Sequence, residues 1–198
     1  MKASGIILAG GKNTRIKTKK AFIQLNGKIT LIENTLTLFK KIFPEIIIVT
    51  NNPGAYSKFE TKVVEDLIKD KGSLGGIFTG LCFSTSQVNF MIGCDMPFPN
   101  SDLINYIIQK PVEYDLVIPV INNKAETLFA RYSKNTLPVI CSHLLKDKLK
   151  LQDLLSDLMA LKITPEEVER FDPEHLSFFN VNTQEDLAKA KDIYSKHR

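Results

Sequence analysis

The 198-residue sequence predicts an α/β fold of three layers, in which helices cover both faces of a mostly parallel sheet. Two observations indicate this class. Apolar runs rich in β-branched residues, such as Glu45–Thr50, are continuous rather than alternating, as expected for strands buried on both faces. Between such runs lie segments with the period of an amphipathic helix, as in Thr30–Phe43, so the chain begins as strand, helix, strand.

The first half of the chain is expected to alternate strands with helices. Pro44 ends the first helix, and Asn51-Asn52-Pro53-Gly54 closes the strand that follows it. A short extended piece is expected over 21–25, and Ser101 is expected to cap a helix. The predicted strands are 6–9, 45–50, 62–66 and 88–94, and the predicted helices are 30–43, 74–83 and the one at Ser101.

The second half is less regular. A strand over 126–132 is expected to run antiparallel to the others, and Thr183–Asp186 has the pattern of a helix cap. The other predicted elements are strands at 114–120, 161–164 and 178–181 and helices at 135–145 and 150–159. The sequence contains no repeat and no Pro/Ser-rich linker, so a single domain over 1–198 is expected.

Composition excludes several classes of function. The net charge of +4 is modest and spread along the chain, and no basic block is interleaved with aromatic residues, so nucleic acid is not an expected partner. Cys82, Cys94 and Cys141 lack C-x-x-C spacing, which is typical of reduced thiols in a cytoplasmic protein. No apolar run approaches the length of a membrane span, so no membrane association is expected.

Polar or glycine residues follow each of the first four predicted strands. Gly10 and Gly11 follow the first, Asn51 the second, Asp66 the third and Asp95 the fourth. Each alone can be explained as a turn or loop residue. Ligands of an open parallel sheet bind outside the carboxyl ends of its strands, so four such features at one edge indicate a ligand site.

The residue types at this edge suit phosphate chemistry. Glycines let backbone N–H groups approach a phosphate, and Arg15 and Lys20 add fixed positive charge. Mg²⁺ is usually held by one or two carboxylates together with phosphate oxygens. Asp95, at the end of a predicted strand, can supply such a carboxylate. The sequence therefore predicts phosphoryl or nucleotidyl transfer by positioning and charge neutralisation, and it suggests no Ser-His-Asp or Cys-His arrangement.

Four segments in chain order carry a resemblance to a known family. They are Leu8-Ala9-Gly10-Gly11 with Arg15 and Lys20, Ser73-Leu74-Gly75-Gly76, Cys94-Asp95-Met96-Pro97-Phe98, and Phe179-Asn180-Val181-Asn182-Thr183. Together they resemble the molybdenum cofactor guanylyltransferases, which are nucleotidyltransferases of Rossmann-like fold. The similarity spans nearly the whole chain, and the second pair of segments favours this branch of the superfamily.

The resemblance implies a Mg²⁺-dependent transfer of GMP from GTP to the phosphate of Mo-molybdopterin, which gives a guanine dinucleotide cofactor and pyrophosphate. It also implies contacts with other proteins of cofactor biosynthesis. The residues that it implies for the nucleotide are Leu8, Ala9, Gly10, Gly11, Lys20, Asn51, Asp66, Gly75 and Asp95.

Within this set the resemblance implies individual roles. Lys20 contacts the phosphates, Asp66 helps to bind guanosine, and Asp95 is the ligand of Mg²⁺. Asn180 and Asn182 lie near the pterin. Arg15 is assigned here to the leaving pyrophosphate because of its charge.

The chain departs from the family pattern at several positions. The basic loop lacks the usual glycine and acidic residue, and Lys20 is chosen over Lys19 because the segment that follows Lys20 is in the expected register. Ser73 and Thr127 stand where proline is usual. Asn51 is chosen as the asparagine after the second strand, although Thr50 and Asn52 are adjacent to it.

Two alternatives remain open from the sequence. The first is a related nucleotidyltransferase that uses CTP or UTP and a sugar or polyol phosphate. The second is a non-catalytic nucleotide-binding homologue, which the altered basic loop suggests but the presence of Lys20 and Asp95 disfavours.

Overall fold

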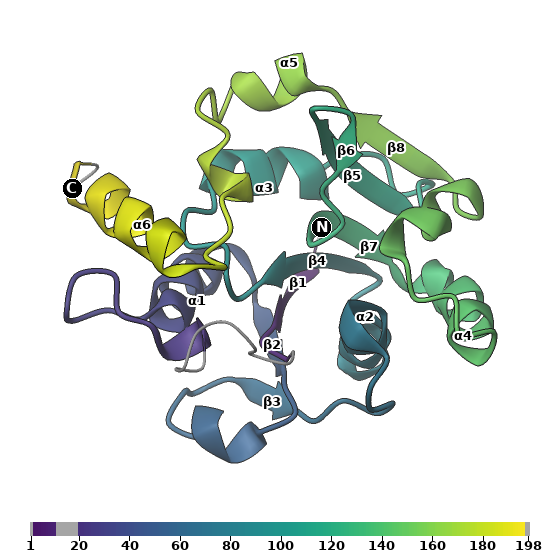
Figure 1. Cartoon of the computed structure of the whole chain (residues 1–198). Helices are drawn as coiled ribbons and strands as arrows, with labels where there is room; N and C mark the ends of the chain where they lie inside the picture. Colours follow the sequence, from purple (N-terminus) through teal and green to yellow (C-terminus); the bar gives the residue numbers. More distant parts are fainter. Residues whose placement is uncertain (1, 11–19, 197–198) are drawn as a thin grey trace.

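The computed structural model describes residues 2–10 and 20–196. Within them the chain forms an eight-stranded sheet of order β3-β2-β1-β4-β7-β5-β6, with β8 paired to β5 beside that path (Figure 1). The strands are β1 (Ala3–Leu8), β2 (Glu45–Val49), β3 (Lys62–Val64), β4 (Val88–Gly93), β5 (Leu116–Ile121), β6 (Lys124–Ala125), β7 (Phe129–Ser133) and β8 (Ala160–Ile163). The α-helices are α1 (Leu31–Ile42), α2 (Gly72–Phe83), α3 (Ser101–Ile108), α4 (Leu137–Leu145), α5 (Pro165–Glu169) and α6 (Gln184–Lys196).

Strand directions confirm the mostly parallel sheet. β1 pairs in parallel with both β2 and β4, and β2 pairs in parallel with β3. β7 lies antiparallel between β4 and β5, which confirms the antiparallel strand predicted in the second half. The strand order reverses at β1, because β2 and β3 lie on one side of it and β4 on the other. A ligand site is therefore expected over the carboxyl ends of β1 and β4.

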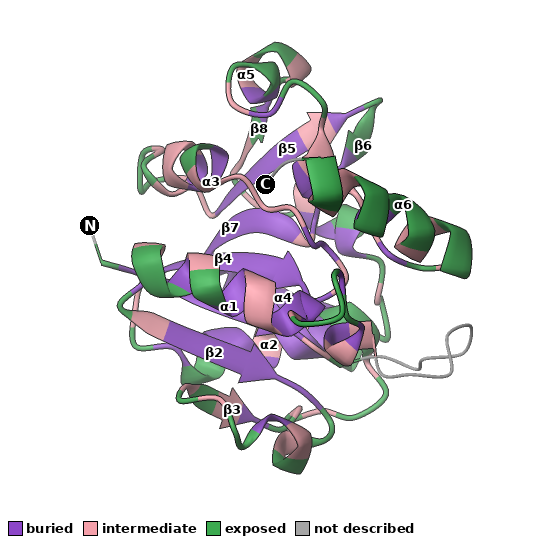
Figure 2. Ribbon diagram, turned by 90° about the vertical axis from the view of Figure 1, so that its left-hand side faces the viewer, coloured by how far each residue is buried: buried purple, intermediate pink, exposed green. Residues whose placement is uncertain are grey.

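The three layers are a layer of helices, the sheet and a second layer of helices, and one buried cluster fills the space on each face of the sheet. Ile7 and Ile48 pack with Phe39 of α1 and Leu103 of α3 on one face of the sheet. The alternate residues of the same strands pack with α2 and α4 on the other face, since successive side chains of a strand point to opposite faces. Figure 2 shows β2 and β4 buried along most of their length.

Helix α2 lies close against β1 because it carries glycine at the contact. A Cβ atom on Gly80 would come within 2.6 Å of Ile6 Cγ2, so a larger residue there would push the helix away. α2 begins at Gly72, whose φ of 56° is in the left-handed region that glycine adopts without strain. None of the described helices is long and apolar enough to cross a membrane.

Four local predictions differ from the structure. Of the extended piece predicted over 21–25, Ala21 and Phe22 instead belong to the 3₁₀ helix η1 (Lys20–Phe22), because Ala21 turns into the core and Ile23 N–H bonds to Lys20 O. Gln24 does pair with Thr30, in an isolated antiparallel bridge. Residues 150–159 form only the 3₁₀ helix η4 (Leu151–Ser156). The cap of α3 is Asn100 rather than Ser101, since Asn100 Oδ1 accepts the N–H groups of Asp102 and Leu103 at 2.9 Å.

The fourth difference concerns the strand predicted over 178–181. The segment contains the end of the 3₁₀ helix η5 (Leu176–Phe178) and forms no strand. Its backbone instead bonds to the loop after β4, where Val181 N–H donates to Asp95 O at 2.9 Å. The prediction was wrong because an apolar run without a neighbouring strand has no partner for its hydrogen bonds.

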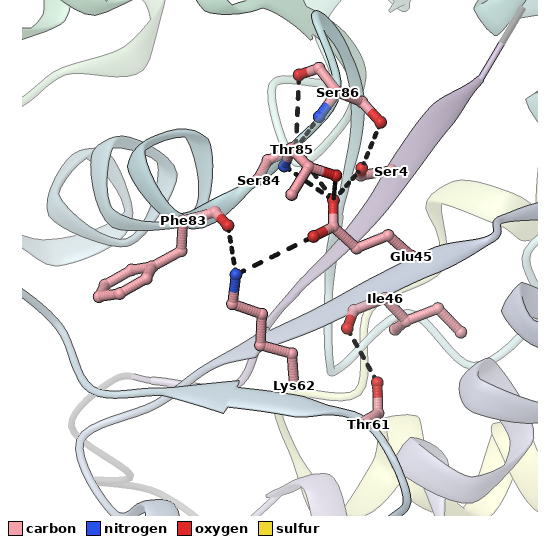
Figure 3. Close-up of polar contacts among 9 residues, drawn as sticks. All are labelled: Ser4, Glu45, Ile46, Thr61, Lys62, Phe83, Ser84, Thr85 and Ser86. Carbon is pink, nitrogen blue, oxygen red and sulfur yellow. Dashed lines mark hydrogen bonds and ion pairs between the residues drawn. The ribbon is translucent and has the colours of Figure 1, made fainter.

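A partly buried carboxylate joins three segments at the amino edge of the sheet, opposite the strand ends discussed below. Glu45 Oε2 at the start of β2 accepts hydrogen bonds from Ser4 Oγ of β1 at 2.5 Å and from Thr85 N and Oγ1 at 2.9 Å (Figure 3). Burial alone raises the pKa of Glu45, but these hydrogen bonds and nearby Lys62 lower it overall. The cluster therefore stabilises the junction of β1, β2 and the α2–β4 loop as long as Glu45 is ionised.

Candidate active site

A pocket of about 730 Å³ lies over the carboxyl ends of β1, β2, β3 and β4. Residues directly after each of these strands line it, and they include Gly10, Asn51, Asp66 and Asp95. Lys20 also lines the wall, carried there by η1. The structure therefore brings into one pocket the features that the sequence places after four separate strands.

The Lys20 ammonium group joins two segments that are distant in the sequence. Lys20 Nζ lies 3.2 Å from Asp95 Oδ2 and donates a hydrogen bond to Asn182 Oδ1 at 2.6 Å. The side chains of Lys20 and Asp95 are 21% and 23% exposed, so the ion pair is partly shielded from water and still accessible to a ligand. A single cation thus lies between a carboxylate and an amide at the pocket wall.

Gly93, two residues before Asp95, cannot be replaced by a larger residue without moving the Asp95 carboxylate. A Cβ atom on Gly93 would lie 2.7 Å from Asp95 Oδ1, so only glycine leaves the carboxylate in this position. Burial raises the pKa of the adjacent Cys94 thiol to about 12, and the Asp95 charge adds to this effect. Cys94 is therefore protonated at neutral pH, which excludes it as a thiolate nucleophile.

Asp66 forms a second polar centre of the pocket, together with Gly10 and Asn51. A Cβ atom on Gly10 would lie 3.4 Å from Asp66 Oδ2 and 3.9 Å from Asn51 Nδ2, which places the three residues together. Burial raises the pKa of Asp66, and the Thr79 hydroxyl and Asn51 amide partly oppose this. Among the described residues, buried Asp66 Oδ1 has no hydrogen-bond partner of good geometry. Such an oxygen suits a ligand that presents N–H donors.

An aromatic wall lies beside the first glycine loop, and the sequence analysis did not predict it. Tyr56 lines the pocket, and its ring stands 5.0 Å from Phe22 and 6.3 Å from Phe59 between centroids. The Tyr56 hydroxyl donates to Ala9 O at 3.4 Å, across 47 positions. Burial raises the pKa of Tyr56 to about 12, so the hydroxyl remains a donor at neutral pH. No local pattern around Tyr56 signals this contact.

The amino end of α2 faces the same pocket. Gly72 and Ser73 line it, and the N-cap residue, Lys71, makes no side-chain capping hydrogen bond. The first N–H groups of a helix are unsatisfied and carry partial positive charge, so this end of α2 favours an anion. The sequence analysis placed the second glycine loop at the site, and this geometry gives it a physical function.

Some predicted site residues lie elsewhere. Gly75 does not line the pocket, and its added Cβ would meet Ile68 O and Lys71 Cβ at 3.0 Å, so it serves the packing of the first turn of α2. Asn180 and Asn182 are not among the lining residues either. Asn180 Nδ2 donates to Phe178 O, whereas Asn182 reaches the site through its contact with Lys20. Gly11 and Arg15 lie outside the described residues.

Within residues 2–10 and 20–196 no group of three or more His, Cys, Asp and Glu side chains can enclose a metal ion. The pocket therefore suits a cation that takes few protein ligands. Asp95 supplies hard carboxylate oxygens at the wall, and Mg²⁺ is commonly held by one or two carboxylates completed by waters and phosphate oxygens. The donor set fits Mg²⁺ shared with a phosphate ligand.

Comparison with known proteins identifies the family. The family model of the MobA-like NTP transferase domain matches residues 5–162. A protein of Peptoclostridium acidaminophilum named as a probable molybdenum cofactor guanylyltransferase is 38% identical over 98% of this chain and 91% of its own. The chain belongs to the molybdenum cofactor guanylyltransferase family of MobA-like NTP transferases. It is a nucleotidyltransferase.

Other members of this guanylyltransferase family agree over the full length. A relative from Natranaerobius thermophilus with the same printed name is 36% identical over 98% of this chain and 97% of its own. The crystal structure of molybdopterin-guanine dinucleotide biosynthesis protein A from Archaeoglobus fulgidus superimposes with a TM-score of 0.86 at 28% identity, over 98% of this chain and 99% of that one. These matches extend beyond residue 162, where the general family model stops, and so include the segment that brings Asn182 to Lys20.

Proposed function

We propose that this nucleotidyltransferase transfers GMP from GTP to the phosphate of Mo-molybdopterin, with Mg²⁺, and that residues 1–198 act as one domain. The observation that carries the choice of nucleotide is the Asp66 carboxylate, whose Oδ1 is buried without a partner among the described residues. It shares a pocket with the Lys20 and Asp95 charges. The printed names of the relatives support the choice of acceptor.

The edge of the guanine base matches the Asp66 carboxylate. Guanine presents two neighbouring donors, N1–H and the 2-amino group, and an ionised carboxylate has two acceptor oxygens. Cytosine presents acceptors at N3 and O2, which would face the carboxylate without hydrogens. A site built for donors rejects a base that leaves its buried acceptor unpaired, often by large factors. The pocket therefore favours GTP over CTP, and Asn51 beside Asp66 adds further hydrogen-bonding capacity.

The phosphates of GTP would lie between the first glycine loop, the amino end of α2 and Lys20. In the reaction, an oxygen of the acceptor phosphate attacks the α-phosphorus of GTP. The bond from that phosphorus to the oxygen bridging to the β-phosphate breaks, and pyrophosphate leaves with the electron pair. Lys20 offsets the negative charge that gathers on the phosphoryl oxygens. Arg15 would neutralise the leaving pyrophosphate.

Asp95 would hold Mg²⁺ through its carboxylate. When bound there, Mg²⁺ supplies positive charge to the phosphates of the nucleotide. Gly93 keeps the Asp95 carboxylate in place, and the Val181 N–H bond to Asp95 O fixes the backbone behind it. Asn180 and the segment around it would lie towards the pterin, and partner proteins of cofactor biosynthesis would deliver and receive it.

Incubation of the protein with GTP, Mg²⁺ and molybdopterin, with mass detection of products, tests the function directly. The guanine dinucleotide and pyrophosphate are expected, and their absence under conditions where GTP binds would contradict the choice of acceptor. A thermal-shift panel with GTP, CTP and UTP tests the base. A nucleotide at 100 times its dissociation constant stabilises by about 2.7 kcal/mol. Stabilisation by CTP or UTP in place of GTP would favour a sugar or polyol phosphate as acceptor.

A further inference from the structure

Among the described residues, the shortest side-chain contact of the Lys20 ammonium group is to a neutral amide. Lys20 Nζ lies 2.6 Å from Asn182 Oδ1 but 3.2 Å from Asp95 Oδ2. A neutral acceptor orients an ammonium group without cancelling its charge, whereas a carboxylate neutralises it. The amide of Asn182 therefore orients Lys20 without itself neutralising the charge.

Both ends of this contact are held by one apolar cluster. Ile23 and Leu25, which follow η1, are buried together with Val181 and with Ala190 of α6. The backbone of Asn182 is fixed as well, because its N–H donates to Asp186 Oδ2 at 3.0 Å in the cap of α6. Two segments 162 positions apart are thus packed into a fixed relationship directly behind Lys20.

Without the amide, Asp95 would be the remaining side-chain partner of Lys20 in the part of the chain that the structure describes. The ammonium group would then move fully onto Asp95 Oδ2, which would weaken the site in two ways. Lys20 would be neutralised before any phosphate arrived, and the carboxylate oxygen suited to a divalent cation would be occupied. The contact with Asn182 limits both effects, because it draws the ammonium group towards an uncharged acceptor.

We propose that Asn182 is a positioning residue for Lys20 and therefore acts in binding the nucleotide triphosphate. This assignment rests on the proposed function, and it differs from the prediction that Asn182 lies on the pterin side. It also gives the segment after residue 162 a function at the nucleotide site, although the general family model ends there.

Calorimetric titration with GTP and Mg²⁺, in the absence of any pterin, separates the two assignments. Asn182→Ala is expected to weaken GTP binding by about five- to tenfold, the size expected for loss of one typical hydrogen bond. Asn182→Asp is expected to weaken it further, because a second carboxylate would compete with the phosphates for Lys20. A residue that serves only the pterin would leave GTP affinity unchanged, and that result would overturn the proposal.

A double-mutant cycle tests whether Asn182 acts through Lys20. In the Lys20→Ala background, Asn182→Ala is expected to change the GTP dissociation constant by less than about twofold, because the group that it positions is gone. An equal loss in both backgrounds would also overturn the proposal, since Asn182 would then act independently. Failure of the wild-type protein to bind GTP would instead count against the proposed function.

Asn182 is exposed, so its substitution is not expected to disturb folding, and a matched variant controls for such a defect. Asn135 is likewise an exposed asparagine that accepts one side-chain hydrogen bond, from Gln87 Nε2 at 2.9 Å, and it does not line the pocket. Asn135→Ala is expected to bind GTP as the wild type does. Equal weakening by Asn135→Ala and Asn182→Ala would show a general effect and contradict the specific role of Asn182.

Discussion

The Lys20 ammonium group lies 3.2 Å from the Asp95 carboxylate, across 75 positions of the chain. η1 carries Lys20 and the end of β4 carries Asp95, so the pair closes the pocket between the first and fourth strands of the parallel half of the sheet. A lysine next to a carboxylate at a strand end can serve a phosphate and its cation at once. Under the proposed function, the ion pair would exchange partners when the nucleotide and its cation enter, and each charge would then face one of opposite sign.

Asp95→Asn is expected to reduce pyrophosphate release at least about 100-fold, because the amide keeps the shape but loses the charge that suits Mg²⁺. The fold is expected to remain intact, since the side chain is partly exposed and the amide can still accept from Lys20. Single-turnover release of pyrophosphate measures the effect, and circular dichroism checks the fold. Unchanged turnover would remove Asp95 from the mechanism.

Asp66→Asn is expected to change the choice of base. The amide places an N–H donor where the carboxylate had an acceptor. This donor would face the donor 2-amino group of guanine unfavourably, but it could donate to the 2-carbonyl group of xanthine. We expect a loss in GTP affinity of about 10- to 100-fold and a gain in XTP affinity relative to the wild type. Titration of both proteins with both nucleotides provides its own control. Parallel weakening for GTP and XTP would show that Asp66 does not contact the base.

The elements that could be predicted from the sequence are those whose signal is local. β1, β2 and β4 are continuous apolar runs, and α1 begins at Thr30 with a reciprocal Thr30–Glu33 capping box. The strand-end residues of the site followed from these elements, because parallel strands bring their carboxyl ends to one edge.

Contacts between distant segments could not be predicted in this way. The amide of Asn182 contacts Lys20 only because α6 packs against the segment after η1, and Tyr56 reaches Ala9 only because the loop after β2 folds back. Arg131 is fully buried, although an arginine in a predicted strand would be assigned to a solvent-facing position. Each of these positions depends on tertiary packing rather than on the neighbouring sequence.

Glu45→Gln is expected to lower stability at neutral pH by about 1–2 kcal/mol, because the donors from Ser4 and Thr85 lose a charged acceptor. The pKa of Glu45 is lowered in the folded protein, so its contribution is present above the unfolded value of about 4.3 and is lost as pH falls through the folded value. Urea denaturation of both proteins from pH 7 to pH 3 measures this.

The difference between wild type and Glu45→Gln should therefore be constant above about pH 5 and shrink below it. Glu65→Gln is a matched control, since Glu65 is half exposed and pairs only with Lys69 at 3.0 Å among the ion pairs of the described residues. Such exposed pairs contribute about 0–1 kcal/mol. An equal effect of both substitutions would mean that the Glu45 cluster does not stabilise the sheet edge.

Arg131→Met is expected to destabilise the protein by about 2–4 kcal/mol. The guanidinium group on β7 is 1% exposed and donates to the carbonyl oxygens of Lys110, Pro111 and Tyr114, which follow α3. Methionine would remove the cost of burying a charge, and burial does lower the pKa of Arg131. Three carbonyl groups would nevertheless lose their donor, and we expect that loss to dominate.

Arg131→Lys distinguishes charge from geometry. The ammonium group keeps the charge, but it lacks the planar fork that reaches three acceptors, so an intermediate loss is expected. Arg170→Met, at an exposed position after α5, should change stability by less than about 0.5 kcal/mol. Urea denaturation gives all three values. A neutral or stabilising Arg131→Met would show that the desolvation cost of the buried cation exceeds the value of its three hydrogen bonds.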